Sequence, residues 1–185
     1  KIMPNGTSAL IVSYDNFKIN KIDLETGTVE AIVGNVSGSQ TSVAFADGPG
    51  SDAKIGKPFH LDISPDGTFA LVADGDNKRI RKIDLTPDTG TTNYSYNVTT
   101  IVGTGVSGSA NGIGSQATIG HATGISIHPN GKKAYFATTS SIRMIDLEST
   151  DSNGNLTYEV SDFYTASSMC YAMDIASFRT TETSF

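Results

Sequence analysis

The sequence predicts an all-β fold of β-propeller blades, which are four-stranded antiparallel sheets, forming an incomplete propeller or a segment of one. Three observations favour this fold. Short β-rich segments alternate with Gly, Asn and Ser, as in chains built of short strands and turns. Ile-Asp-Leu triplets begin at positions 22, 83 and 145, with spacings of 61 and 62 residues. Pro-Asn/Asp-Gly turns begin at positions 4, 65 and 129, with spacings of 61 and 64, and a fixed period indicates a solenoid, propeller or array.

Each repeat reads as four short strands, which is the strand count of a propeller blade. In the repeat that follows the pattern best, the expected strands lie within 60–67, 69–74, 79–85 and 99–103. The blades are expected at approximately 1–34, 57–103 and 121–165, with the start of another at 170–185.

The connections also repeat. Residues 35–56 and 104–120 are long loops rich in Gly and Ser, and each leads from one blade into the next. Residues 86–97 form an enlarged loop between the third and fourth strands of the second blade. Asp74-Gly75-Asp76-Asn77-Lys78 is a hairpin signal, across which Asp74 is expected to face Arg79. The last strand of the third blade, 158–164, departs from the Ile-Val-Gly pattern that ends the earlier ones.

These residues carry a resemblance to a known family. The segments are Ala110-Asn111-Gly112-Ile113-Gly114, Gly124-Ile125-Ser126-Ile127, Leu71-Val72-Ala73-Asp74 and Arg79-Ile80-Arg81-Lys82-Ile83. Together they resemble NHL repeats, a propeller family, over most of the chain. The resemblance implies the fold. It leaves the function open, because NHL-like propellers include ligand-binding scaffolds, sensor ectodomains and a few lyases and hydrolases.

The number of repeats limits the architecture. Propellers close with about 4–8 blades, whereas this chain supplies three and the start of a fourth. Either it is a segment of a longer protein or neighbouring chains complete it. The expected partners are therefore other protein chains or further blades of the same protein, since open blade faces expose apolar surface.

Composition narrows the partners further. The formal net charge is −6 and no basic cluster occurs, which argues against nucleic acid. No apolar run reaches the length of a spanning helix, so no membrane insertion is expected in this segment. The chain begins within a repeat, so any secretory signal would lie elsewhere.

Acceptor triplets for N-glycans suggest an extracellular, secreted protein with N-linked glycans as partners. A chain rich in Asn, Ser and Thr also produces such triplets by chance. Four of the five should crowd one face of the blades, and the other face, which carries the long loops, is the expected binding face. The acceptors are Asn5, Asn35, Asn93, Asn97 and Asn155, of which Asn35 is the one expected on the loop face.

The sequence predicts neither a metal site nor a catalytic site, and no cofactor. The residues nearest to a metal set are His60, Asp62 and Asp174, on inner strands that face the channel. The third-blade counterpart of His60 is Gly124, so no ring of histidines forms. Asp62 and Asp174 occupy matching positions, where inner-strand polar groups usually form structural hydrogen bonds.

Two further motifs are interpreted structurally. Gly103-Thr104-Gly105-Val106-Ser107-Gly108 matches a dinucleotide fingerprint, but the residues after it are too rich in glycine to begin the required helix. Cys170 lies in an apolar run and reads as a small buried side chain, with a reactive thiol or intermolecular disulfide as alternatives.

The sequence therefore favours a non-catalytic extracellular structural or binding module, N-glycosylated and part of a larger assembly or filament. The first alternative is a metal-dependent lyase or hydrolase of the propeller class. The second is a sensor ectodomain, in which the acceptor triplets would be accidental.

Overall fold

A computed structural model describes residues 1–34, 42–91 and 93–165. Within these ranges the chain forms eleven strands in three antiparallel sheets, and the only helix is the 3-10 turn Tyr14–Asn16. None of this part of the chain forms a helix long and apolar enough to cross a membrane. The predicted all-β, incomplete propeller fold is confirmed.

The first sheet has the order β1-β2-β3, and Ile2 adds an isolated bridge to Ala9 of β1. The end of an inner strand thus lies beside β1, as the repeat pattern predicts. The strands are β1 (Ser8–Ser13), β2 (Lys18–Asp23) and β3 (Val29–Val33).

The middle sheet and the last sheet each have four strands in chain order, so each is a complete blade. The middle sheet contains β4 (Pro58–Ile63), β5 (Phe69–Asp74), β6 (Arg79–Asp84) and β7 (Val98–Val102). The last sheet contains β8 (Gly124–Ile127), β9 (Lys133–Ala137), β10 (Ser141–Asp146) and β11 (Val160–Thr165).

The Pro-Asn/Asp-Gly turns connect the inner strand of each blade to the next strand. Gly67 has φ 75°, a left-handed conformation that favours glycine, and Gly6 and Gly131 have φ 72° and 74°. The Asp66 carboxylate accepts hydrogen bonds from the Thr68 backbone N–H at 3.0 Å and the Ser64 hydroxyl at 2.7 Å. Local turn chemistry therefore explains why these three positions are marked in the sequence.

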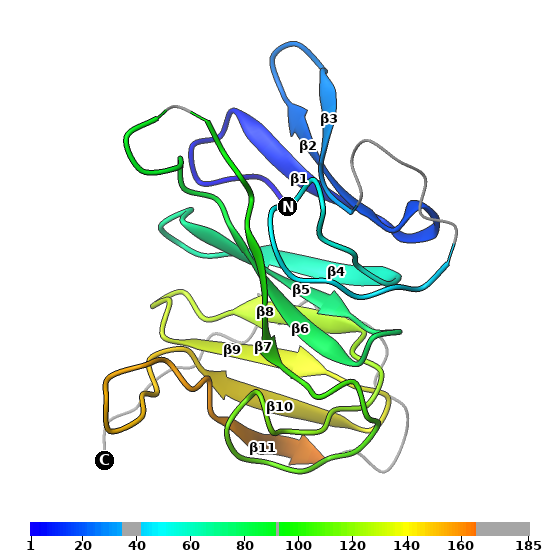
Figure 1. The fold of residues 1–185 in the computed structure, drawn as a ribbon, viewed down its shortest axis with the longest axis vertical. Coiled ribbons are helices and arrows are strands. Elements are labelled where there is room, and N and C mark those ends of the chain that lie inside the picture. The colour runs from blue at the N-terminus through cyan, green and yellow to red at the C-terminus, as the bar shows by residue number, and fades with distance from the viewer. Residues whose placement is uncertain (35–41, 92, 166–185) are drawn as a thin grey trace.

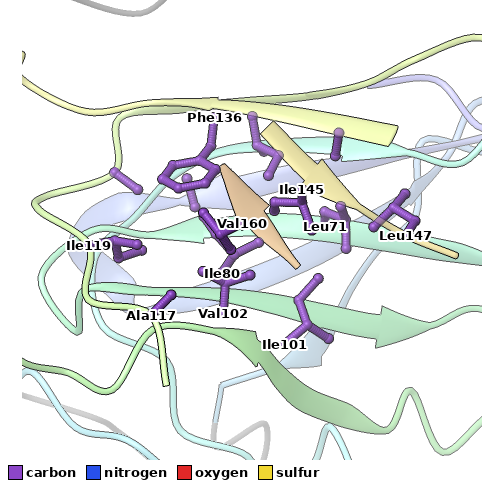
Figure 2. Packing of buried hydrophobic residues seen from close by; sticks show 14 of the residues in the cluster. Leu71, Ile80, Ile101, Val102, Ala117, Ile119, Phe136, Ile145, Leu147 and Val160 are labelled. Atoms are coloured by element: carbon purple, nitrogen blue, oxygen red, sulfur yellow. The ribbon is translucent and has the colours of Figure 1, made fainter. Parts of the chain in front are cut away.

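The three sheets are stacked face to face, with the middle sheet between the other two (Figure 1). Two apolar cores result, one at each junction. The core between the first and middle sheets includes Leu10, Ile19, Val72 and Ile83, all at most 1% exposed. Figure 2 shows the core between the middle and last sheets, where Phe136 and Ile145 face Leu71 and Ile80.

Several predicted features lie outside the described residues. These are the start of a further blade at 170–185, with Cys170 and Asp174, and the acceptor Asn35.

Candidate functional site

The best candidate site is a cavity of about 400 Å³ on the channel side of the blades. It lies where β4 and β8 end, beside the prolines of the three turns. We call it the half-channel, because the inner strands of three blades border it. Its lining residues are Lys1, Ile2, Pro4, Asp62, Ile63, Ser64, Pro65, Ser126, Ile127, His128, Pro129, Tyr135, Ile142 and Phe163.

The polar wall of the half-channel comes from one repeat position. Lys1, Asp62 and Ser126 each lie three residues before the proline of a turn. The Lys1 Nζ lies 3.0 Å from Asp62 Oδ1, and the Ser126 hydroxyl donates to Asp62 Oδ2 at 3.4 Å. Asp62 Oδ2 also accepts from the Ile127 N–H at 2.8 Å. Groups of the neighbouring blades thus satisfy the hydrogen-bonding capacity of the buried Asp62 carboxylate. The sequence indicated Asp62 as a candidate residue but did not predict its partner Lys1.

His60 has a similar structural role. Its Nδ1 lies 2.9 Å from the Ile125 carbonyl oxygen. Side chains of β4 therefore bind the backbone of β8 at two places, His60 to Ile125 and Asp62 to Ile127, although the two strands share no ladder. Through the described ranges no three His, Cys, Asp or Glu side chains gather as a metal set would require. These contacts support the structural interpretation of both residues.

The other wall of the half-channel is apolar and partly aromatic. Tyr135 and Phe163 pack edge to face with ring centroids 5.0 Å apart. Phe163 is 57% exposed, although it lies on a strand face that is buried in the other blades. The sequence signalled this wall only as the departure of the 158–164 strand from the repeat pattern. A carboxylate, a lysine and the rings of Tyr135 and Phe163 in one hollow favour binding of a partner with polar and apolar parts.

Buried arginines, for which the sequence predicted no role, hold the long loops. Arg81 Nη2 donates to the Ala46 carbonyl at 2.8 Å and to Asp47 Oδ1 at 2.6 Å. Its Nη1 donates to Asp74 Oδ2 at 3.0 Å, so Asp74 pairs with Arg81 and not with Arg79, its register neighbour. Burial raises the pKa of Asp74, and the Asn77 amide and Arg81 guanidinium oppose that rise.

The last sheet repeats the arrangement. Arg143 is 1% exposed, and its Nη2 donates to the Ala110 carbonyl at 2.8 Å and to Asn111 Oδ1 at 2.7 Å. Burial lowers the pKa of the Arg143 guanidinium. The corresponding residue of the first sheet is Asn20. The sequence does contain an arginine at this same position of two repeats, Arg81 and Arg143, and this recurrence could have indicated a shared role.

The long loops pack along the outer strands of the blades that follow them. Gly48 bridges Val98 at the start of β7, and Gly112 bridges Val160 at the start of β11. Loops in these places cover sheet edges that would otherwise be open to further pairing. Their main contacts are therefore structural. Binding on the loop face stays a prediction, and the half-channel lies at the opposite ends of the inner strands.

The described acceptor asparagines gather at the turn end of the sheets. Asn5 lies in the first turn, Asn93 and Asn97 lie in or beside the β6–β7 loop, and Asn155 lies in the β10–β11 loop. All four are exposed. These loops begin beside the turns, since the Leu85 N–H bonds the Thr68 carbonyl at 2.9 Å. The geometry agrees with the one-face arrangement expected for these four.

Comparisons with known proteins identify similar repeats. The chain is 28% identical to NHL repeat-containing protein 2 of Gallus gallus and 29% identical to that of Bos taurus, over 145 residues. The match covers 75% of this chain and 19% of each relative, so the chain spans about a fifth of their length. No family model matches the chain.

Similar solved structures agree in fold. A Bacteroides thetaiotaomicron protein of unknown function matches with a TM-score of 0.60 at 16% identity, over 86% of this chain and 32% of that one. Kuenenia stuttgartiensis hydrazine synthase matches with 0.56 at 18%, over 92% and 36%. A nidogen/laminin complex contains a chain that matches with 0.56 at 12%, over 90% and 47%. At these identities the likeness concerns the fold alone.

Proposed function

We propose that this chain, an incomplete propeller whose repeats resemble NHL repeats, serves as a non-catalytic, N-glycosylated binding module of a larger extracellular assembly. Its blades form a rigid scaffold. The turn end of the sheets carries the sugars, and the half-channel and the uncovered sheet faces contact partner chains, in head-to-tail fashion where blades meet. A filament is the open form of such an assembly.

The arrangement of the acceptor triplets carries this proposal. Asn5, Asn93, Asn97 and Asn155 are all exposed and lie at one end of the sheets, although they come from three blades. Sugar attached there would leave the stacked faces free. One similar structure is that of a nidogen/laminin complex.

The test is intact-mass analysis of native protein before and after enzymatic removal of N-glycans. We expect a mass above the 19.4 kDa of the polypeptide that falls in glycan-sized steps. Asn5→Gln should remove one such step. Asn130→Gln is the matched control, because Asn130 occupies the same turn position in the third repeat but has no Ser or Thr two residues later. A native protein without sugar would overturn the glycoprotein proposal and favour the sensor ectodomain.

A metal-dependent lyase or hydrolase is the second candidate, and the buried Asp62 carboxylate in the half-channel is the observation that favours it. Against it, the carboxylate already accepts from the Ile127 and Ile63 backbone N–H groups and pairs with Lys1. Metal analysis of the purified protein separates the two. One tightly held zinc or calcium ion that is lost in Asp62→Asn would contradict the binding-module proposal and support the enzyme.

A further inference from the structure

Two sheet faces are left uncovered within the described part of the chain. The first-sheet face looks away from the middle sheet and consists of Ile2, Ile11, Ile22, Leu24 and Val29. The last-sheet face looks away from the middle sheet on the other side and consists of Tyr135, Ile142, Phe163 and Tyr164. Of these nine side chains, Ile142 is 6% exposed, and Ile2, Ile11, Leu24, Val29, Phe163 and Tyr164 are between 41% and 61% exposed.

Comparison with the middle sheet shows which kind of surface the first-sheet face matches. Its five residues correspond in sequence to a set in the middle sheet that packs against the first sheet. That set is at most 6% exposed, and it consists of Ile63, Val72, Ile83, Leu85 and Val98. The last sheet uses its own counterparts, such as Phe136 and Ile145, against the middle sheet. The first-sheet face therefore has the side chains that, in the other two sheets, pack against the preceding blade.

The last-sheet face is the complementary surface. Its residues correspond to a set in the middle sheet that packs against the last sheet, namely Leu71, Ile80, Ile101 and Val102, which are at most 3% exposed. In the first sheet the same positions are Leu10, Ile19, Ile32 and Val33, which pack against the middle sheet. Each internal junction thus joins a face of the last-sheet type to a face of the first-sheet type, and the described part of the chain leaves one face of each type without a neighbouring sheet.

Large aromatic side chains distinguish the last-sheet face from its counterparts in the two internal junctions. Inside the chain, Ala53 and Ile55 of one long loop help to fill the first junction, and Ala117 and Ile119 of the next loop help to fill the second. At the last-sheet face, the residues that follow Thr165 lie outside the described part of the chain. Phe163 and Tyr164, in place of Ile101 and Val102, supply additional volume there.

We propose that a second copy of this chain covers both faces, with the last-sheet face of each copy packed on the first-sheet face of the other. Continuity with the two internal junctions supports this pairing, since each is a contact of the same kind. The described blades of two copies number six, within the 4–8 of closed propellers. Such a head-to-tail contact closes if two copies complete the ring. Closure also joins two half-channels, so that Asp62 of both copies faces one enclosed channel.

The proposal does not depend on attached sugar, so its failure and the failure of the proposed glycoprotein are distinguishable. The test is sedimentation analysis and native mass spectrometry of the unglycosylated chain at micromolar concentration. We expect a single species of twice the 19.4 kDa chain mass. A monomer at all concentrations, or a series of ever longer species, would overturn the closed ring.

Two variants with exposed sites test the direction of the contact. Ile11→Lys changes the first-sheet face and Phe163→Lys changes the last-sheet face, while Val106→Lys, at a 64% exposed loop site, is the control. Each face variant should be monomeric alone, because every junction then contains a lysine. A mixture of the two should regain dimer, because one junction then joins two unchanged faces. Persistence of the dimer in either variant alone would indicate a like-to-like contact and contradict the proposal.

Discussion

At the residue scale, the buried arginines bind the long loops to the sheets. Arg81 is fully buried, and its guanidinium bonds one carboxylate of its own hairpin, Asp74, and one of the preceding loop, Asp47. It also bonds the carbonyl groups of Ala46 and Lys54. Removing one partner of a buried ion pair leaves the other charge without compensation, which costs far more than losing a surface pair.

Arg81→Met should therefore destabilise the protein by about 3–5 kcal/mol, since Asp74 would remain buried without its cation. Urea unfolding followed by circular dichroism measures the change. Lys133→Met is the matched control, because Lys133 is exposed and such substitutions usually change stability by less than about 0.5 kcal/mol. Equal effects of the two would show that the arginine does not hold the loop.

The turn carboxylate Asp66 makes a prediction about acid stability. Hydrogen bonds from the Thr68 backbone and the Ser64 hydroxyl lower the pKa of Asp66 below its ordinary value. Its contribution to stability is thus fully present above the ordinary pKa, about 3.9, and is lost as the pH falls through the lower folded value. Asn5 and Asn130 occupy this turn position in the other repeats, so asparagine fits there and does not titrate.

Asp66→Asn should accordingly lose less stability than the unchanged protein between pH 6 and pH 2, the range on either side of about 3.9. Urea midpoints across this range supply the comparison. A steeper acid loss in the variant would mean that the carboxylate is destabilising in the folded state.

Sequence reasoning at this scale found the residues with local roles and missed those with distant partners. The turn glycines and Asp66 are bound to neighbours two or three positions away, so their spacing in the sequence reveals them. Arg81 bonds residues 34 and 35 positions earlier, and Lys1 bonds Asp62. Packing of the long loop on the middle sheet brings Arg81 to its partners, stacking of blades brings Lys1 to Asp62, and no local pattern encodes either contact.

At the element scale, the glycine that ends each regular blade has a steric reason. Gly103 has φ 101°, and a β-carbon there would lie 2.3 Å from the Lys78 carbonyl oxygen. Its N–H bonds the Gly114 carbonyl of the next long loop at 2.9 Å. Gly34 makes the matching contact with Gly50, whereas Thr165 occupies this position in the last sheet. The loss of glycine coincides with the aromatic last-sheet face, so the third blade ends differently from the others.

Gly103→Ala should destabilise the protein by more than about 2 kcal/mol, because a left-handed conformation costs about 1–2 kcal/mol for alanine and the carbonyl clash adds to it. Gly90→Ala is the control, since Gly90 has φ 76° but open space around its β-carbon position. Thermal and urea unfolding of the two variants give the difference. If Gly90→Ala cost as much as Gly103→Ala, backbone conformation alone would explain the effect.

At the scale of the whole molecule, the described residues cover the middle sheet on both faces, whereas they stack a sheet against each outer sheet on one face. The repeats predict three similar blades, and they are similar in strand order and register. Alternation within a strand assigns side chains to two faces, but it does not say which faces have a neighbour. The exposed fractions of the side chains show which faces have a neighbour. Ile101 is 3% exposed in the middle sheet, and its counterpart Phe163 is 57% exposed in the last sheet.

Hydrogen exchange should therefore be slowest in the middle sheet, because amides in elements covered on both sides open only with the largest unfolding unit. We expect the central strands β5 and β6 to exchange more slowly than β9 and β10, their counterparts in the last sheet. The measurement belongs on the Ile11→Lys variant, in which a second copy cannot cover the outer faces by the contact proposed above. Peptide-resolved exchange at several protein concentrations gives the rates. Equal protection of the two pairs of strands would show that the last-sheet face is covered even in that variant. Its exposed aromatic residues would then have a partner other than the first-sheet face of a second copy.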